Sequence, residues 1–97
     1  MEFEWDADKE LGNIKKHGVT FQEAVECFFD EHAIQLEDPK HSRGEARHYL
    51  VGRTKSGRVL TTRFTYRGAA IRIIGSGEWR KGRKLYHERA KLEKSQD

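Results

Sequence analysis

The sequence has a single cysteine, a single proline and no hydrophobic run long enough to cross a bilayer. One cysteine cannot form an internal disulfide, which argues against a disulfide-stapled secreted domain and agrees with a reducing compartment. A membrane-spanning helix needs about 18 consecutive apolar residues, and acidic residues stand where a signal peptide would be basic and then apolar. We therefore expect a cytoplasmic protein without a membrane partner, in which Cys27, next to Phe28 and Phe29, is a buried structural thiol.

The sequence also lacks the spacing of a metal site or a nucleotide-binding loop. Its histidines are scattered at positions 17, 32, 41, 48 and 87, and there is no cysteine pair. The run Gly75-Ser76-Gly77 is too short for a full phosphate-binding loop. We expect no metal and no cofactor.

Acidic residues are scarce in the second part of the chain. Residues 1–38 hold 3 basic and 11 acidic side chains, a net charge of −8, whereas residues 39–97 hold 16 and 5, a net charge of +11. This asymmetry favours a polyanionic partner, with nucleic acid the leading candidate. The alternative is that the acidic part folds back and neutralises the basic part. A chain of 97 residues is expected to form one domain, residues 1–97.

Local signals predict the order βααββββα. Asp6 is placed to cap a helix over Ala7 to His17 that ends at Gly18, and Thr20 with Glu23 forms a capping box for a second helix. Alternation predicts strands at Phe3–Trp5, Ala33–Glu37, Arg47–Arg53, and on both sides of Arg67-Gly68, with a polar loop at Pro39–Glu45 and a helix at the C-terminus. We expect an α+β domain with a mainly antiparallel sheet, two N-terminal helices on one face and a basic C-terminal helix.

Symmetric hairpin loops would set the strand register. A loop centred on Arg67-Gly68 puts Leu60, Phe64, Ile71 and Ile73 on the core face, with Arg63 opposite Arg72 on the other. A four-residue loop at Thr54 to Gly57 pairs Tyr49 with Thr62, Val51 with Leu60 and His48 with Arg63. His48, Arg63 and Arg72 then form one row. Two facing arginines repel unless an anion lies over them, so the row is a candidate phosphate site; the alternative is that they point into solvent or meet acids.

The C-terminal helix divides into two arcs when its residues are projected at about 100° each. One arc docks on the domain and holds Trp79, Gly82, Leu85, Tyr86, Ala90 and Leu92. The other arc is cationic and holds Arg80, Arg83, Lys84, His87, Lys91 and Lys94.

Short motifs in a fixed order resemble the BrnT family over nearly the whole chain. They are Phe3, Trp5-Asp6, Lys9, Asn13, Lys16-His17-Gly18-Val19, Phe21, Glu23-Ala24, Glu37-Asp38-Pro39, Glu45-x-Arg47, Val51-Gly52-Arg53, Gly57-Arg58, Arg72-Ile73-Ile74 and Leu85-Tyr86. The resemblance implies a RelE-like fold and an endoribonuclease toxin of a type II toxin–antitoxin system. Many members follow the Arg-Ile-Ile strand with Ser-Ala-Arg; here Gly75-Ser76-Gly77 stands instead, and Arg80 would substitute for the missing arginine.

Metal-independent RNA cleavage needs a base for the 2′-hydroxyl, cations on the phosphate and an acid for the leaving 5′-oxygen. The catalytic candidates are Arg63, Arg72 and Arg80 for the phosphate and His48 or Tyr86 for proton transfer. The competing interpretation is that His48 is a structural histidine and Tyr86 a tyrosine of the core. The candidate RNA contacts are Lys16, His17, Arg53, Arg83 and Lys84; helix-terminal charge alone also explains Lys16 and His17.

The implied partners are RNA and a BrnA-like antitoxin that neutralises the toxin. Operator DNA would be reached only through that antitoxin, in a multimeric complex. Two other functions fit the same charges: a non-catalytic nucleic-acid-binding or regulatory module, and a protein-binding domain that acts only in complex with an antitoxin. Only a nuclease produces new RNA termini.

Overall fold

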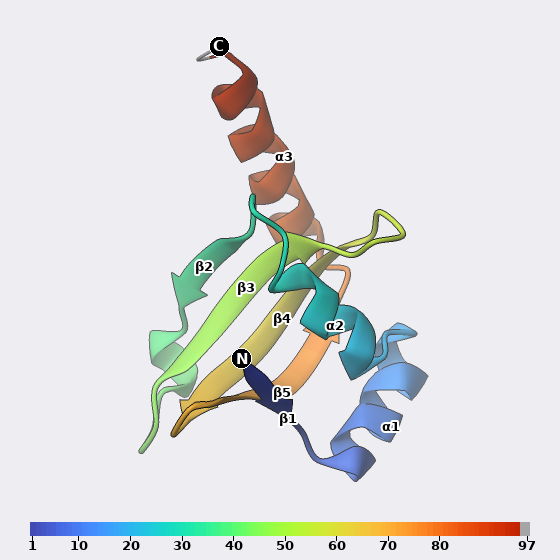
Figure 1. Ribbon diagram of the computed structural model, residues 1–97, viewed down its shortest axis with the longest axis vertical. Coiled ribbons are helices and arrows are strands. Elements are labelled where there is room, and N and C mark those ends of the chain that lie inside the picture. The colour runs from blue at the N-terminus through green and yellow to red at the C-terminus, as the bar shows by residue number, and fades with distance from the viewer. Residues whose placement is uncertain (96–97) are drawn as a thin grey trace.

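A five-stranded sheet and three helices make up the protein, and the computed structural model describes residues 1–95. The strands lie in the order β1-β5-β4-β3-β2, with β1 parallel to β5 and the other pairs antiparallel. The predicted order βααββββα and the α+β class are confirmed (Figure 1). The elements are β1 (Glu2–Glu4), α1 (Ala7–His17), α2 (Phe21–Cys27), β2 (Ile34–Glu37), a 3₁₀ turn (Pro39–His41), β3 (Arg47–Arg53), β4 (Val59–Arg67), β5 (Ala70–Gly77) and α3 (Arg80–Ser95).

The first two helices begin at their predicted caps, and α1 ends at its predicted glycine. The Asp6 carboxylate accepts hydrogen bonds from the backbone of residues 8 and 9, and Gly18 ends α1 with φ of 65°. Thr20 and Glu23 form the full capping box at the start of α2. None of the helices in the described part of the chain is long and apolar enough to span a membrane.

Helix α2 covers one face of the sheet and forms the main core with it. The predicted core face of the hairpin is confirmed, because Leu60, Phe64, Ile71 and Ile73 are all buried. Gly52 lets β3 approach α2 closely, since a Cβ there would lie 2.7 Å from the backbone oxygen of Cys27. Cys27 is fully buried as predicted, and desolvation raises the pKa of its thiol to about 12. We call this side of the sheet the α2 face.

Helix α1 is fastened to the end of β5 by one buried amide. The Asn13 side chain donates to the backbone oxygens of Val19 and Ser76 and accepts from the Ser76 backbone N–H. Ser76 also exchanges a hydroxyl hydrogen bond with Thr62 on β4. Because these backbone groups would otherwise be buried and unpaired, Asn13 fixes where β5 leaves the sheet and where α3 begins.

The predicted register between β3 and β4 is wrong by one residue. His48 lies opposite Phe64, and Tyr49 lies opposite Arg63. The loop has five residues, 54–58, rather than four, because Gly57 takes a left-handed conformation with φ of 94° and Arg58 then still lies in the loop. A shift of one residue reverses the faces, so His48 and Arg63 lie on opposite sides of the sheet.

The predicted register between β4 and β5 is also wrong. The turn is centred on residues 68–69, so Arg67 pairs with Ala70 and Arg72 pairs with Thr65 rather than Arg63. Gly68, with φ of 59°, provides the tight turn. A bulge between Arg63 and Phe64 then brings Arg63 opposite Gly75. Arg63 and Arg72 still share a face, as diagonal neighbours.

Helix α3 lies across the other face of the sheet at one end and then projects away from the domain (Figure 1). Gly82 sits directly on β4, where a Cβ would overlap Thr61 Oγ1. Tyr86 is buried, but Leu92 is 66% exposed. The predicted docking arc is therefore correct for the first turns and wrong for Leu92, because the helix extends beyond the sheet that would cover it. We call this side the open face.

Candidate functional site

Three arginines from three strands lie together on the open face. Arg47 on β3, Thr65 on β4 and Arg72 on β5 form one row across the sheet, and Arg63 lies two residues along β4 from Thr65. Side chains opposite one another, or two apart on a strand, share a face. Arg63 is thus the diagonal neighbour of both other arginines, at about 7–8 Å between backbone positions. We call Arg47, Arg63 and Arg72 the arginine patch.

The patch is only partly neutralised. Arg72 Nη1 lies 2.8 Å from Glu4 Oε2, a carboxylate on the neighbouring strand β1. Within residues 1–95, neither Arg47 nor Arg63 forms an ion pair, and the buried Nε of each has no hydrogen-bond partner. Buried donors are normally paired. Both side chains are only partly buried and have no carboxylate partner in that range, so their terminal guanidinium nitrogens can pair with an anion.

A short turn places His41 beside the patch. The Ser42 hydroxyl donates to the Asp38 backbone oxygen and accepts from the Arg47 backbone N–H, which ties the turn to the start of β3. His41 Nδ1 lies 2.9 Å from Asp38 Oδ2. Lys40, His41, Arg43 and Arg47 line one hollow. The loop predicted at Pro39–Glu45 therefore begins with a 3₁₀ turn and lies beside the arginine patch on the open face.

The His41 and Asp38 side chains have the arrangement of an oriented general base. The Asp38 side chain is 5% exposed and the His41 side chain 50% exposed. Because an ionised carboxylate only accepts hydrogen bonds, Asp38 favours the tautomer with the proton on Nδ1 and leaves Nε2 free to accept one. No group of three or more His, Cys, Asp or Glu side chains is placed to hold a metal ion in the described part of the chain.

Tyr49 joins the histidine turn to the arginine patch. It lies opposite Arg63, and burial followed by the neighbouring Asp38 carboxylate raises the pKa of its hydroxyl. Arg63 opposes that shift with its positive charge. Tyr49 is therefore a neutral phenol at physiological pH, suited to hydrogen bonding and stacking.

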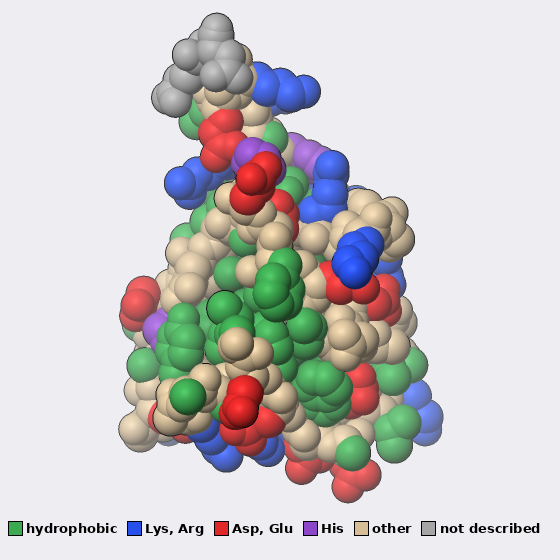
Figure 2. Space-filling view, viewed as in Figure 1, with side chains coloured by type: hydrophobic (Ala, Val, Ile, Leu, Met, Phe, Trp, Pro, Cys, Tyr) green, Lys and Arg blue, Asp and Glu red, His purple; other side chains and the backbone are tan. Residues whose placement is uncertain are grey.

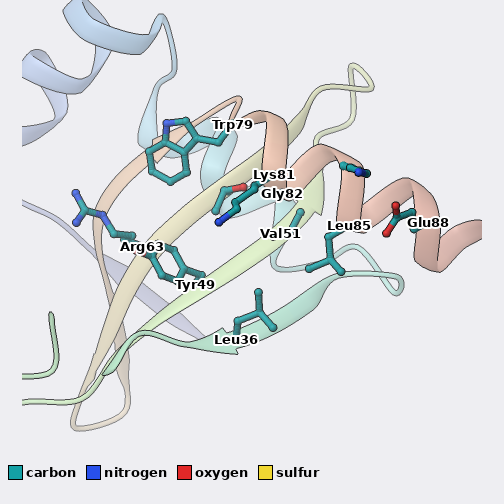
Figure 3. A pocket seen from close by; sticks show the side chains of 11 residues that line it. Leu36, Tyr49, Val51, Arg63, Trp79, Lys81, Gly82, Leu85 and Glu88 are labelled. Carbon is teal, nitrogen blue, oxygen red and sulfur yellow. The ribbon is translucent and has the colours of Figure 1, made fainter. Parts of the chain in front are cut away.

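Above these residues, the first turns of α3 and the sheet enclose a groove of about 840 Å³ (Figure 3). Leu36, Val51 and Leu85 give it apolar walls, and Tyr49 and Arg63 line it as well. The groove and the arginine patch therefore meet at Arg63.

Two of the predicted catalytic residues lie away from this site. His48 is buried on the α2 face, with its ring centroid 5.4 Å from that of Phe64. The Tyr86 hydroxyl donates to Asp30 Oδ2 at 2.6 Å. Burial and Asp30 raise the pKa of Tyr86 to about 12, so it is a weak acid whose proton is already shared. The predicted row of His48, Arg63 and Arg72 does not form.

The predicted substitute arginine lies at the start of α3. Arg80 is exposed and does not line the groove, whereas Lys81 does. Residues two positions apart in a helix are separated by about 200° around its axis. Arg80 therefore points roughly opposite Gly82, which faces the sheet. Its catalytic role stays a prediction.

The predicted RNA contacts are distributed over several surfaces. Lys84 lines the groove. The His17 ring lies edge-on to Trp79 at 6.0 Å, and Lys16 is exposed beside it on α1. Arg83 pairs with Glu78 at 3.4 Å, and Arg53 lies over the Tyr86 ring at 5.9 Å. Only Lys84 shares the groove with the arginine patch.

Sequence reasoning missed His41, Asp38, Tyr49 and Arg47 as members of one site. The available signal was a dense polar run, Asp38 to Arg47, that combines a carboxylate, a histidine and several cations next to a strand. Because this run was interpreted as a loop, the pairing of His41 with Asp38 was not predicted. That pairing depends on the 3₁₀ turn.

Comparison with known proteins indicates one family. A family model described as the ribonuclease toxin BrnT of type II toxin–antitoxin systems matches residues 5–82. The crystal structure of the ribonuclease toxin BrnT of Brucella abortus has 23% sequence identity and a TM-score of 0.62, covering 81% of this chain and 96% of that chain. At that identity the structural likeness establishes the fold alone. No curated protein sequence matches.

Proposed function

This chain belongs to the BrnT family of ribonuclease toxins of type II toxin–antitoxin systems, and we propose that it cleaves RNA on the open face without a metal ion. The observation that supports this site is the arginine patch, with two guanidinium groups that have no acidic partner in residues 1–95, beside the His41–Asp38 pair. Action in the cytoplasm, which the sequence led us to expect, belongs to the same proposal.

Each group has a definite task in the proposed reaction. His41 Nε2 takes the proton of the 2′-hydroxyl while the 2′-oxygen bonds to phosphorus and the bond to the 5′-oxygen breaks. Arg47, Arg63 and Arg72 hold the non-bridging oxygens, where negative charge increases in the transition state. The site is open to water, which returns a proton to the leaving 5′-oxygen. The products are a 2′,3′-cyclic phosphate and a 5′-hydroxyl.

Purified protein is expected to cleave a labelled single-stranded RNA at an undiminished rate in excess EDTA, because the proposed groups supply both charge and proton transfer. End-group analysis of the fragments should find cyclic phosphate and 5′-hydroxyl termini. Cleavage that stops in EDTA and returns with a divalent cation would contradict the metal-free mechanism. Binding of RNA without new termini would favour the non-catalytic alternative instead.

The family description implies an antitoxin partner. We propose that a BrnA-like antitoxin docks on the α2 face. Figure 2 shows hydrophobic side chains gathered at the centre of this face. Phe29 is 69% exposed and Tyr66 50% exposed, at the two ends of a chain of ring contacts that runs through Phe3, Phe28 and Phe64. Exposed apolar patches of this kind mark protein interfaces. The multimeric complex and its binding to operator DNA through the antitoxin are part of this proposal.

Phe29→Ser is expected to weaken antitoxin binding about tenfold or more, because exposed aromatic side chains are frequent hot spots. Titration calorimetry with the purified antitoxin measures the affinity. RNA cleavage by the free variant should equal that of wild type, since Phe29 lies on the opposite side of the sheet from the arginine patch. Unchanged antitoxin affinity would place the docking surface elsewhere.

A further inference from the structure

The groove beside the arginine patch has the lining of a site for a flat, partly polar group. In Figure 3 the Trp79 ring, the Arg63 guanidinium and the Tyr49 ring lie toward one end, and Leu85 and Glu88 toward the other. Its volume of about 840 Å³ lies within the about 300–1,000 Å³ that is usual for small-ligand pockets. Aromatic rings with an adjacent guanidinium are the groups on which nucleobases stack.

The charges of the lining argue against a purely apolar occupant. Arg63, Lys81 and Lys84 line the groove, and Glu88 is the one acidic lining residue in the described part of the chain. An apolar side chain from a partner protein would leave this excess of positive charge without a counter-charge. A nucleotide carries a negative phosphate next to its base, and the edge of the base carries both donors and acceptors. It can therefore meet the cations and the polar side chains of the groove together.

The position of Arg63 links this groove to the reaction. Arg63 lines the groove and is also the central member of the arginine patch. In RNA one ribose separates a base from its phosphate. A phosphate held at Arg63 therefore brings a neighbouring base to the mouth of the groove, between Tyr49 and Trp79. Lys81 and Lys84 on α3 line the same groove and are exposed, which suits an adjoining phosphate.

We propose that the groove is a nucleobase subsite, which binds the base next to the scissile phosphate by stacking against Trp79 and Tyr49. The proposal rests on RNA cleavage at the arginine patch. It makes the base beside the cut a determinant of the cleavage rate. The competing occupant is an apolar segment of the antitoxin.

The test uses DNA oligonucleotides that contain a single ribonucleotide, because only that residue has the 2′-hydroxyl needed for cleavage. One substrate has all its bases, and two others have an abasic residue on the 5′ or the 3′ side of the scissile phosphate. With wild-type protein, removal of one of the two bases is expected to lower kcat/KM about 10- to 100-fold, the range of a lost stacking contact. Trp79→Ala should cleave the intact and the abasic substrates at equal rates, whereas Trp79→Phe should restore the difference.

The outcomes separate this proposal from the proposed function. Cleavage of all three substrates at equal rates by wild type overturns the base subsite and leaves RNA cleavage intact. No cleavage of any ribonucleotide substrate overturns the proposed function itself. If Trp79→Ala weakens antitoxin binding and keeps the abasic effect, the groove is a protein-docking site and the proposal is wrong. The wild-type comparison needs no variant, so it decides the question even if Trp79→Ala does not fold.

Discussion

Replacing Arg63 with methionine is expected to lower the rate of RNA cleavage about 10²- to 10³-fold, the usual effect of removing one fixed donor from a developing oxyanion. Arg63 lies diagonal to both Arg47 and Arg72 and has no acidic partner in the described chain. Its full charge is therefore available to the phosphate. Single-turnover cleavage of a labelled RNA measures the loss of kcat, and induced expression measures the loss of growth arrest.

The variant should remain folded. Arg63 Nε is buried without a partner, so methionine removes an unpaired donor and keeps much of the side-chain volume. Its free energy of unfolding in urea should not fall below that of wild type by more than about 1 kcal/mol.

Arg80→Met is the matched control. It removes the same charge from an exposed position outside the groove, and we expect cleavage within about threefold of wild type, as for other surface charges far from the reaction. An equal loss in both variants would instead support Arg80 as the substitute for the family's missing arginine and would contradict the proposed site.

Replacing His41 with glutamine is expected to lower kcat about 10²- to 10⁴-fold, the contribution of a positioned general base. Glutamine can still donate a hydrogen bond to Asp38 but cannot take the proton of the 2′-hydroxyl. The affinity for uncleavable 2′-deoxy oligonucleotide should change little, because the arginine patch is intact. A fall in affinity with an unchanged kcat would assign His41 to binding rather than to proton transfer.

His48→Gln tests the rival histidine in the same assay. His48 packs between Phe64 and Tyr66 on the α2 face, and its Nδ1 lies 3.8 Å from Glu37 Oε1. The substitution should cost stability through lost ring contacts, on the order of 1 kcal/mol, and leave kcat of the folded fraction unchanged. Loss of kcat in His48→Gln with retention in His41→Gln would restore His48 as the catalytic base.

Local signals predicted the elements well because each depends on residues close together in sequence. The Asp6 cap, the glycine at 18 and the box of Thr20 with Glu23 act within one helical turn, and the structure confirms all of them. Burial at Cys27 was predictable for a similar reason, since cysteine beside apolar residues is most often buried; Phe29 of the same run is nevertheless 69% exposed.

The position of the site was less predictable because it depends on how loops set register. Arg58 lies in the loop of the first hairpin and not in the strand, and this one extra loop residue separates His48 from Arg63 by the thickness of the sheet. The second turn and its bulge replace the expected facing pair of Arg63 and Arg72 with a diagonal one. In both hairpins the sequence placed the centre of the turn too early in the chain, so both errors have the same origin.

The sequence by itself determined the α+β class, the caps that begin the first two helices, the buried thiol and the excess of positive charge in the second part of the chain. Through its ordered motifs it also indicated the family. Only the tertiary structure decided which cations share a face, which histidine stands beside them and where the groove lies. The physical reason is that charge and capping are properties of nearby residues, whereas a site on a sheet is assembled from separate strands, and a single added residue in a turn exchanges one face for the other.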